Sequence, residues 1–304
     1  MIDISILIPT FRRPRLLTRV LDSCLAQQDV AMPFEIVVID NDPDGSARQT
    51  VETKAQGSGV PIRYVHEPRP GISHARNTGI ANASGRYVVF IDDDEEAAPG
   101  WLAAFLATAK TCGADVVIGP VLPRFPPGGP TPDAYRRRVY TRNAQVPTGT
   151  VLSRWSGIGN TLLDKERCVA GIAEPFDPRL GLSGGEDSLF LRQLMRRGCK
   201  LVWCAEAVAW EEVPVDRLGT HYLLRRAFRG AQTTTFVCTA ITPPEWGRAM
   251  LWMAIGCAQV VLYAPVALLL WSFKDKRWLR IADKAVGGLG KVLWHPKMHL
   301  RLYR

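Results

Sequence analysis

In the first 120 residues, short hydrophobic runs alternate with polar loops and with segments whose apolar residues have helical spacing. Four runs rich in β-branched residues predict buried strands, at 5–9, 35–39, 62–65 and 87–91. Apolar spacing at 16–21 and the segment 71–80 predict helices between them. Strands alternating with helices favour an α/β fold, a mixed but mostly parallel sheet flanked by helices with right-handed crossovers.

The strand at 87–91 runs directly into five consecutive carboxylates, Asp92 to Glu96. Burying adjacent acids unpaired would be costly, so this strand end predicts a bound cation. Oxygen ligands favour Mg²⁺ or Mn²⁺ over zinc, and both ions commonly bind a phosphorylated partner. The strand at 35–39 also ends in an acid, Asp40, on the same edge of the sheet. The alternative is a solvated acidic loop that caps the helix beginning near Trp101.

The pattern changes after a further predicted strand at 114–121. A proline- and glycine-rich loop at 123–132 marks a plausible boundary between two halves. In the second half, Glu186 and Asp187 open a predicted helix that Gly198 closes, so these acids could be helix caps only. The last predicted strand is 200–203.

The C-terminal part is basic and apolar. The net charge of +9 fits an anionic partner, and it concentrates toward residues 217–304. Residues 249–273 carry no charged side chain and are long enough to cross a bilayer, with cations and tryptophans at both ends. We favour a monotopic arrangement, with a helix broken near Pro265 or two interfacial helices. A single crossing and a buried helix pair in a soluble dimer are the alternatives.

Several common functions lack their sequence signals. The chain contains no GxGxxG and no Walker A sequence, and its five histidines adjoin no recognisable nucleophile elbow. The seven cysteines form no CxxC pair, which predicts reduced thiols in place of disulfides or a zinc site. The N-terminus reads as a strand and not as a signal peptide, so we expect a protein that is not secreted.

Residues 3 to 215 resemble the inverting family-two glycosyltransferases with a GT-A fold, in the branch that builds bacterial surface polysaccharides. The matching segments, in the expected order, are Ser5–Arg13, Val37–Asn41, Ala75–Gly79, Asp92–Asp94 and Gly184–Asp187. The resemblance implies a nucleotide-sugar donor, usually UDP-linked, and a divalent ion, Mn²⁺ or Mg²⁺, as cofactor.

The resemblance also assigns roles to individual residues. The residues expected to bind the nucleotide sugar are Pro9, Thr10, Arg12, Asp40, Arg76, Asp92 and Asp93. Asp94, with Asp92, would bind the metal ion. Asp187 matches the catalytic base, and Glu186 would orient the acceptor or exchange roles with it. Relatives also place a metal-binding histidine after the second-half strand, where this chain has Glu211 and Glu212. One of these could substitute, or the ion could rely on phosphate and water.

These observations predict three parts: a nucleotide-sugar-binding half (1–112), an acceptor and catalytic-base half (113–215), and a membrane-associated tail (216–304). We expect sugar transfer to a lipid-linked, oligosaccharide or polysaccharide acceptor, at the cytoplasmic face of the inner membrane. A nucleotidyltransferase would need a glycine-rich basic loop near the N-terminus, which is not found. A nucleic-acid-binding protein would also use the positive charge, but that charge lies beside the apolar run, which suits lipid better. We therefore expect no nucleic-acid partner, and the oligomeric state stays open.

Overall fold

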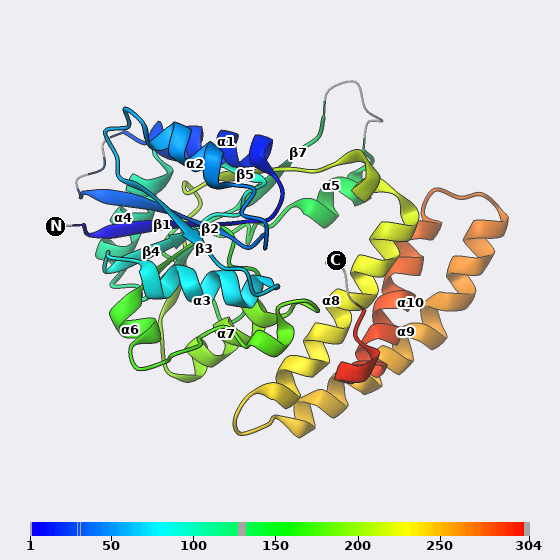
Figure 1. The fold of residues 1–304 in the computed structure, drawn as a ribbon. Coiled ribbons are helices and arrows are strands. Elements are labelled where there is room, and N and C mark those ends of the chain that lie inside the picture. Colours follow the sequence, from blue (N-terminus) through cyan, green and yellow to red (C-terminus); the bar gives the residue numbers. More distant parts are fainter. Residues whose placement is uncertain (1, 29, 31, 127–131, 301–304) are drawn as a thin grey trace.

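The computed structural model describes residues 2–28, 30, 32–126 and 132–300. A twisted sheet with helices on both faces forms one side of the molecule, and the helices of the C-terminal part stand beside it (Figure 1). This is the mostly parallel α/β architecture that the sequence predicts.

In the described part of the chain, the larger sheet has seven strands in the order β3-β2-β1-β4-β8-β6-β9. Their bounds are β1 Ile4–Thr10, β2 Phe34–Asp40, β3 Ile62–His66, β4 Tyr87–Phe90, β6 Val116–Ile118, β8 Thr161–Asp164 and β9 Leu201–Trp203. β1 pairs in parallel with β2 and β4, while β8 runs antiparallel between β4 and β6. Strands of the two predicted halves therefore share one sheet, and their functional division stays a prediction.

Helices cover both faces of this sheet because its central strands are apolar on both sides. One face is covered by α1 Pro14–Leu25, α2 Arg48–Ala55 and α4 Trp101–Cys112, and the other by α3 Ile72–Asn82, α6 Lys165–Val169 and α7 Glu186–Arg196. Along β1, Ile6 and Ile8 pack in the core under α1 and α4, whereas Leu7 packs under α3. The alternating strand therefore anchors both helical layers.

A smaller sheet, in the order β5-β10-β7, corrects two predictions. It consists of β5 Glu95–Ala97, β7 Val121–Arg124 and β10 Ala209–Glu212. The predicted strand 114–121 is really two strands in different sheets, because β6 pairs with β8 and β9 whereas β7, after Gly119 and Pro120, pairs with β10. The segment 200–203 is not the last strand, since β10 follows it. Part of the predicted 123–132 loop lies outside the described residues.

The remaining elements form the C-terminal part and short connections. They are α5 Ala134–Tyr140, α8 Thr220–Ala240, α9 Trp246–Ser272 and α10 Trp278–Val292, with single 3₁₀ turns η1 Pro178–Leu180, η2 Val215–Leu218 and η3 Pro296–Met298. We call α8, α9 and α10 the tail helices. α10 packs against both α8 and α9, and α8 also contacts α7 (Figure 1).

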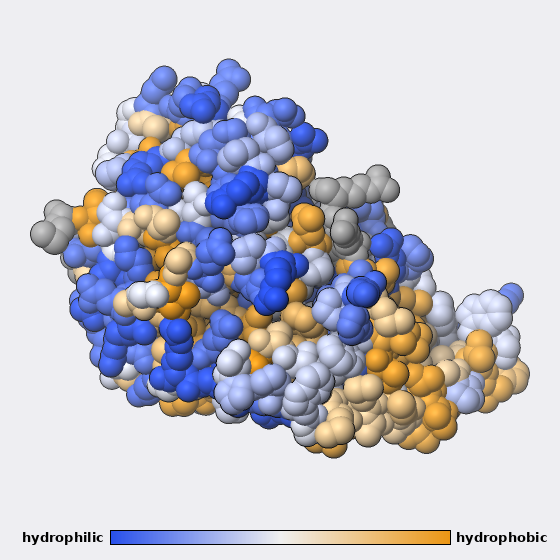
Figure 2. All heavy atoms as spheres, turned by 60° about the horizontal axis from the view of Figure 1, so that its bottom comes forward, coloured by the Kyte–Doolittle hydropathy of each residue, from blue (hydrophilic) through white to orange (hydrophobic). Residues whose placement is uncertain are grey.

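The prediction of a helix broken near Pro265 is wrong, because α9 continues through this residue. A proline removes one helical hydrogen bond without ending α9 here, and α9 packs along α10. Among the described residues, α9 is the one helix long and apolar enough to cross a membrane, and only 11% of its most apolar window is buried. Figure 2 shows the hydrophobic surface gathered at this end of the molecule.

Candidate active site

The acid run sits where the ends of β1 and β4 meet. Asp93 is buried, and its carboxylate accepts hydrogen bonds from Thr10 Oγ1 at 2.8 Å and from Arg13 Nη1 at 2.8 Å. Thr10 ends β1, the parallel neighbour of β4. The structure therefore brings Thr10 and Asp93 together, as their positions at adjacent strand ends predict.

Asp94 lies beside other carboxylates and beside guanidinium groups. Its Oδ2 is 3.1 Å from Arg13 Nη1 and 3.6 Å from Arg217 Nη1. Burial, followed by the charges of Glu211, Asp93 and Asp92, raises the pKa of Asp94 to about 7. Like charges held close together in a buried place disfavour ionisation, so this position gains from a nearby cation.

Glu211 and Glu212 point in different directions along β10. Glu211 is buried near Asp94, and Arg142 Nη2 donates to it at 3.4 Å and to Glu95 at 2.6 Å. Glu212 instead contacts arginines of α1, among them Arg15 at 3.1 Å. Side chains alternate across a strand, which explains the split. Of the two predicted substitutes for the missing histidine, Glu211 is the one that faces the acid run.

We call Asp92, Asp93, Asp94, Glu95 and Glu211 the acid cluster. In the described residues, no group of three or more Asp, Glu, His or Cys side chains is already gathered as an ion-binding set. The donors are nevertheless all oxygens, and burial together with neighbouring acids raises the pKa of Asp94. This donor chemistry fits Mn²⁺ or Mg²⁺.

Arg76 joins the acid cluster to the second pair of predicted acids. It is buried on α3, with Nη1 2.7 Å from Glu186 Oε1 and Nη2 3.6 Å from Asp92 Oδ1. Burial, and then the charge of Asp187, raises the pKa of Glu186 to about 7. Acids about 90 residues apart in the chain therefore meet across one guanidinium group.

The segment from Gly157 to Gly159 runs along the same site. A Cβ on Gly159 would lie 2.5 Å from Asp92 Oδ2, and a Cβ on Gly157 would lie 4.0 Å from Asp187 Oδ2. Asp92 and Asp187 thus lie against two glycines of a single short segment. In the sequence, the two glycines are the only signal that this segment lies close to Asp92 and Asp187.

Asp187 is the more accessible acid at the start of α7. Its side chain is partly exposed, whereas Glu186 is buried. Asp187 Oδ1 accepts a hydrogen bond from the Ser188 backbone N–H at 2.6 Å. Gly184 and Gly185 precede this pair with φ of +73° and +98°, values that favour glycine and produce the tight turn into the helix.

The other predicted nucleotide-sugar-binding residues lie in or just after the end of β1, at Pro9 and Arg12, and at the end of β2, at Asp40. The Asp40 carboxylate is buried and accepts from the backbone N–H groups of Asp42 and Ala47 and from the Tyr64 hydroxyl. Arg12, 56% exposed, pairs with Asp42 at 3.0 Å. Pro9 pairs with Ile39 in the sheet. Asp42 thus links Asp40 to Arg12, and the roles of these residues toward a nucleotide stay predictions.

Three arginines that contact the acid cluster were not predicted: Arg13, Arg142 and Arg217. Arg13 stands beside Arg12 in the same sequence motif, so its position was a usable signal. Arg142 and Arg217 are far from Glu95 and Asp94 in sequence, and no local pattern marks them. Their role follows only from the tertiary structure.

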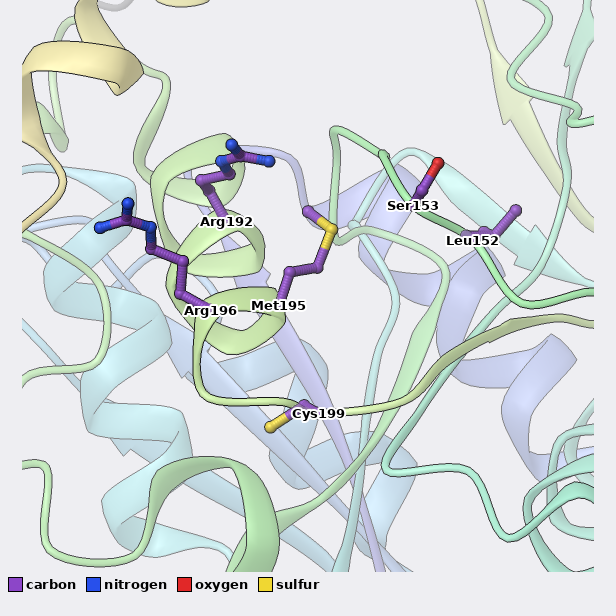
Figure 3. A pocket seen from close by; sticks show the side chains of 6 residues that line it. All are labelled: Leu152, Ser153, Arg192, Met195, Arg196 and Cys199. Carbon is purple, nitrogen blue, oxygen red and sulfur yellow. The ribbon is translucent and has the colours of Figure 1, made fainter. Parts of the chain in front are cut away.

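A pocket of about 270 Å³ lies elsewhere, beside the C-terminal turns of α7 (Figure 3). It is lined by Leu152, Ser153, Arg192, Met195, Arg196 and Cys199. Arg192 Nη2 donates to both carboxylate oxygens of Glu245, at 2.8 and 2.9 Å, just before α9 begins. None of the predicted site residues lines this pocket, and its arginines attach α7 to the tail helices.

The fold is similar to those of solved glycosyltransferases with the GT-A fold. TarS of S. aureus in complex with UDP-GlcNAc matches with a TM-score of 0.56 at 15% identity, over 96% of this chain and 90% of that one. Mannosyltransferase PcManGT from Pyrobaculum calidifontis, in complex with GDP-Man and Mn²⁺, matches with a TM-score of 0.58 at 19% identity, over 96% and 87%. Similarity at this level of identity supports the fold.

Similarity in amino-acid sequence supports the family as well as the fold. Succinoglycan biosynthesis protein ExoM of Rhizobium meliloti is 32% identical over 236 residues, which span 76% of this chain and 74% of that protein. The pattern of glycosyl transferase family 2 matches residues 5–164, more than half of the chain. The chain therefore belongs to glycosyl transferase family 2.

Proposed function

We propose that the protein transfers a sugar, with inversion, from a nucleotide donor to a growing surface polysaccharide or its lipid-linked precursor. The observation that carries the proposal is the Arg76 guanidinium, which contacts Asp92 on one side and Glu186 on the other. Arg76 thus joins Asp92, which we assign to the donor side, and Glu186, which we assign to the acceptor side, at one site. The resemblance to ExoM, a succinoglycan biosynthesis protein, supports a polysaccharide product.

We assign the donor to the side of the site formed by the ends of β1, β2 and β4. Pro9, Thr10, Arg12, Asp40, Arg76, Asp92 and Asp93 would form this side. Thr10 is hydrogen-bonded to Asp93, and the Asp40 carboxylate accepts a hydrogen bond from the backbone N–H of Asp42 in the loop after β2. We infer a UDP-linked sugar, which the complex of TarS with UDP-GlcNAc supports.

The acid cluster is our candidate for the metal site. Asp94 and Asp92 would hold Mn²⁺ or Mg²⁺, and Glu211 stands where it can take the place of the missing histidine. When bound, such an ion neutralises the diphosphate of the donor and stabilises the departing nucleotide. Mn²⁺ accompanies the donor in the PcManGT complex.

Asp187 is our proposed catalytic base. Inversion needs a group on the acceptor side that takes a proton from the attacking hydroxyl, and a carboxylate suffices where its pKa suits the working pH. Asp187 is partly exposed, so an acceptor can reach it. Glu186 is fixed by Arg76, which suits the orienting role better than proton transfer.

We assign the exposed face of α9 to a membrane surface, at the cytoplasmic side where nucleotide sugars are made. Large apolar side chains such as Val261, Leu262 and Leu268 are 64–70% exposed on this helix. Cations and aromatic side chains flank both of its ends, at Trp246 with Arg248 and at Trp271 with Lys274. Since both ends carry interface anchors and α8 packs on α7, a helix lying in the interface suits this surface.

The decisive experiment replaces Asp187 by Asn. We expect Asp187→Asn to lower transfer by at least 10²-fold while nucleotide affinity stays within about twofold, because only the proton acceptor is lost. Glu52→Gln, an exposed acid on α2, is the control and keeps wild-type turnover. NMR of the product reports the inverted anomeric configuration. Unchanged turnover of Asp187→Asn, a retained configuration, or release of pyrophosphate would each contradict the proposal.

A further inference from the structure

Helix α8, the first tail helix, lies directly over the loop that presents Asp187. We call residues 183–187 the base loop. A Cβ on Gly184 would lie 1.3 Å from Arg229 Nη2, and a Cβ on Gly185 would lie 2.9 Å from Thr233 Cγ2. Both glycines have positive φ, which favours glycine, and side chains of α8 occupy the space that a Cβ would need.

The contact between α8 and the base loop is polar as well as steric. Arg229 Nε donates to the Ser183 backbone oxygen at 2.5 Å. Arg229 is also one of the charges that lower the pKa of Glu186, together with Arg76 and against the effect of Asp187. Arg229 therefore contacts the base loop through its backbone and acts on its buried acid through charge.

The same face of α8 is fixed by apolar packing. Phe236 and Val237 of α8 form a buried cluster with Leu180, just before the base loop, and with Leu189, just after it. On the opposite side of the loop, a Cβ on Gly71 would meet Gly181 backbone atoms at 3.2 Å. The base loop and the turn before it thus contact both α3 and α8.

Another face of α8 is hydrogen-bonded to the end of α10 and to the residues that follow it. The Gln232 amide is buried and donates to the backbone oxygens of Leu293, at 2.6 Å, and Met298, at 2.9 Å. Thr235 Oγ1 donates to the Lys291 oxygen at 3.0 Å. α10 in turn packs closely on α9, where a Cβ on Gly256 would lie 2.6 Å from the Gly288 oxygen.

We propose that Arg229 and Thr233 are positioning residues for sugar transfer, so that the face of α8 that carries them supports the site. The observations are the two glycines that pass under these side chains and the hydrogen bond to the loop backbone. Arg229 contacts the backbone of the base loop and acts through that loop. The inference rests on the proposed function, because it assigns a purpose to the place of Asp187.

The test compares Arg229→Ala with Arg225→Ala, one turn earlier on the same helix and exposed. We expect Arg229→Ala to lower kcat by about 10²-fold, since displacing a reacting group by about 1 Å has effects of this order. The donor KM and the nucleotide affinity stay within about threefold, because the donor side is held by other elements. Arg225→Ala keeps wild-type kcat.

A conservative variant distinguishes positioning from folding. Arg229→Lys keeps a positive donor near the Ser183 oxygen, so we expect a kcat between those of the wild type and Arg229→Ala. If Arg229→Ala does not fold, as shown by the loss of a cooperative thermal unfolding transition, Arg229→Lys alone decides. Wild-type kcat in either variant that folds, or a parallel loss of kcat and nucleotide affinity, would overturn the inference. Absence of transfer by the wild type would instead refute the proposed function.

Discussion

The substitution Gly159→Ala, which adds one methyl group, tests whether sugar transfer depends on the position of Asp92. The backbone of Gly159 is outside the left-handed region, so alanine meets no conformational strain there. Its Cβ would lie 2.5 Å from Asp92 Oδ2 and 2.9 Å from Glu95 Oε1, where an ordinary contact begins at 3.4 Å. Glu95 is completely buried and held by Arg142, so Asp92, 30% exposed, is the side chain that must move.

The required movement is large on the scale of catalysis. Restoring 3.4 Å moves the Asp92 carboxylate by about 0.9 Å and so changes its 3.6 Å contact with Arg76. A displacement of about 1 Å at a reacting site can cost on the order of 10²-fold in rate, or about 2.7 kcal/mol of barrier. Extra volume in a packed place costs about 1–3 kcal/mol of stability, so part of the effect appears as a lower Tm.

The assay is kcat/KM for nucleotide release that depends on acceptor, together with Tm. Gly59→Ala is the matched control, because Gly59 also has an ordinary backbone conformation and a Cβ there meets nothing within 4 Å. We expect about a 10²-fold loss for Gly159→Ala and none for Gly59→Ala. Wild-type kcat/KM in a folded Gly159→Ala would show that the place of Asp92 is not needed for transfer.

Three further predictions concern other parts of the molecule. The folded pKa of Glu186, about 7, lies above the ordinary 4.5, so its contribution to stability is present below about pH 4.5 and is lost as pH rises through 7. Glu186→Gln should therefore flatten the pH dependence of the free energy of unfolding in urea between about pH 4.5 and 7. Equal pH slopes for the variant and the wild type would contradict the assignment. Glu211→Gln should weaken Mn²⁺-dependent donor binding about tenfold or more by calorimetry, whereas Glu212→Gln should not, and the reverse order would exclude Glu211 as ligand. Leu262→Glu, on the exposed face of α9, should leave Tm unchanged and lower sedimentation with anionic vesicles at least tenfold, so unchanged partitioning would argue against a lipid-facing α9.

The sequence alone predicts the central strands well, for a physical reason. β1, β2 and β4 are buried on both faces, so each appears as a nearly continuous apolar run. The helix at α7 was equally visible, because acids begin it and Gly198, with φ of +83°, follows its last turn. These signals are local, and local signals survive in a single sequence.

The missed elements depend on pairing between distant segments. β10 carries two acids in four residues, and its strand conformation comes from pairing with β5 and β7. β8 was not recognised as the antiparallel strand that joins β4 to β6. The same holds for Arg142, whose partners Glu95 and Glu211 are 47 and 69 residues away. No window of a few residues contains this information.

Arginines already neutralise part of the charge of the acids that we propose as the metal site. The five carboxylates of the acid cluster face four guanidinium groups, those of Arg13, Arg76, Arg142 and Arg217. Arg142 lies between Glu95 and Glu211, and Arg13 lies between Asp93 and Asp94. Arg217 also contacts Asp94, the acid whose pKa is raised to about 7. A divalent cation at Asp94 would therefore compete with these two arginines for the carboxylate. Guanidinium groups bind phosphate oxygens readily, so we expect Arg13 and Arg217 to turn from Asp94 toward the donor diphosphate when donor and metal bind together.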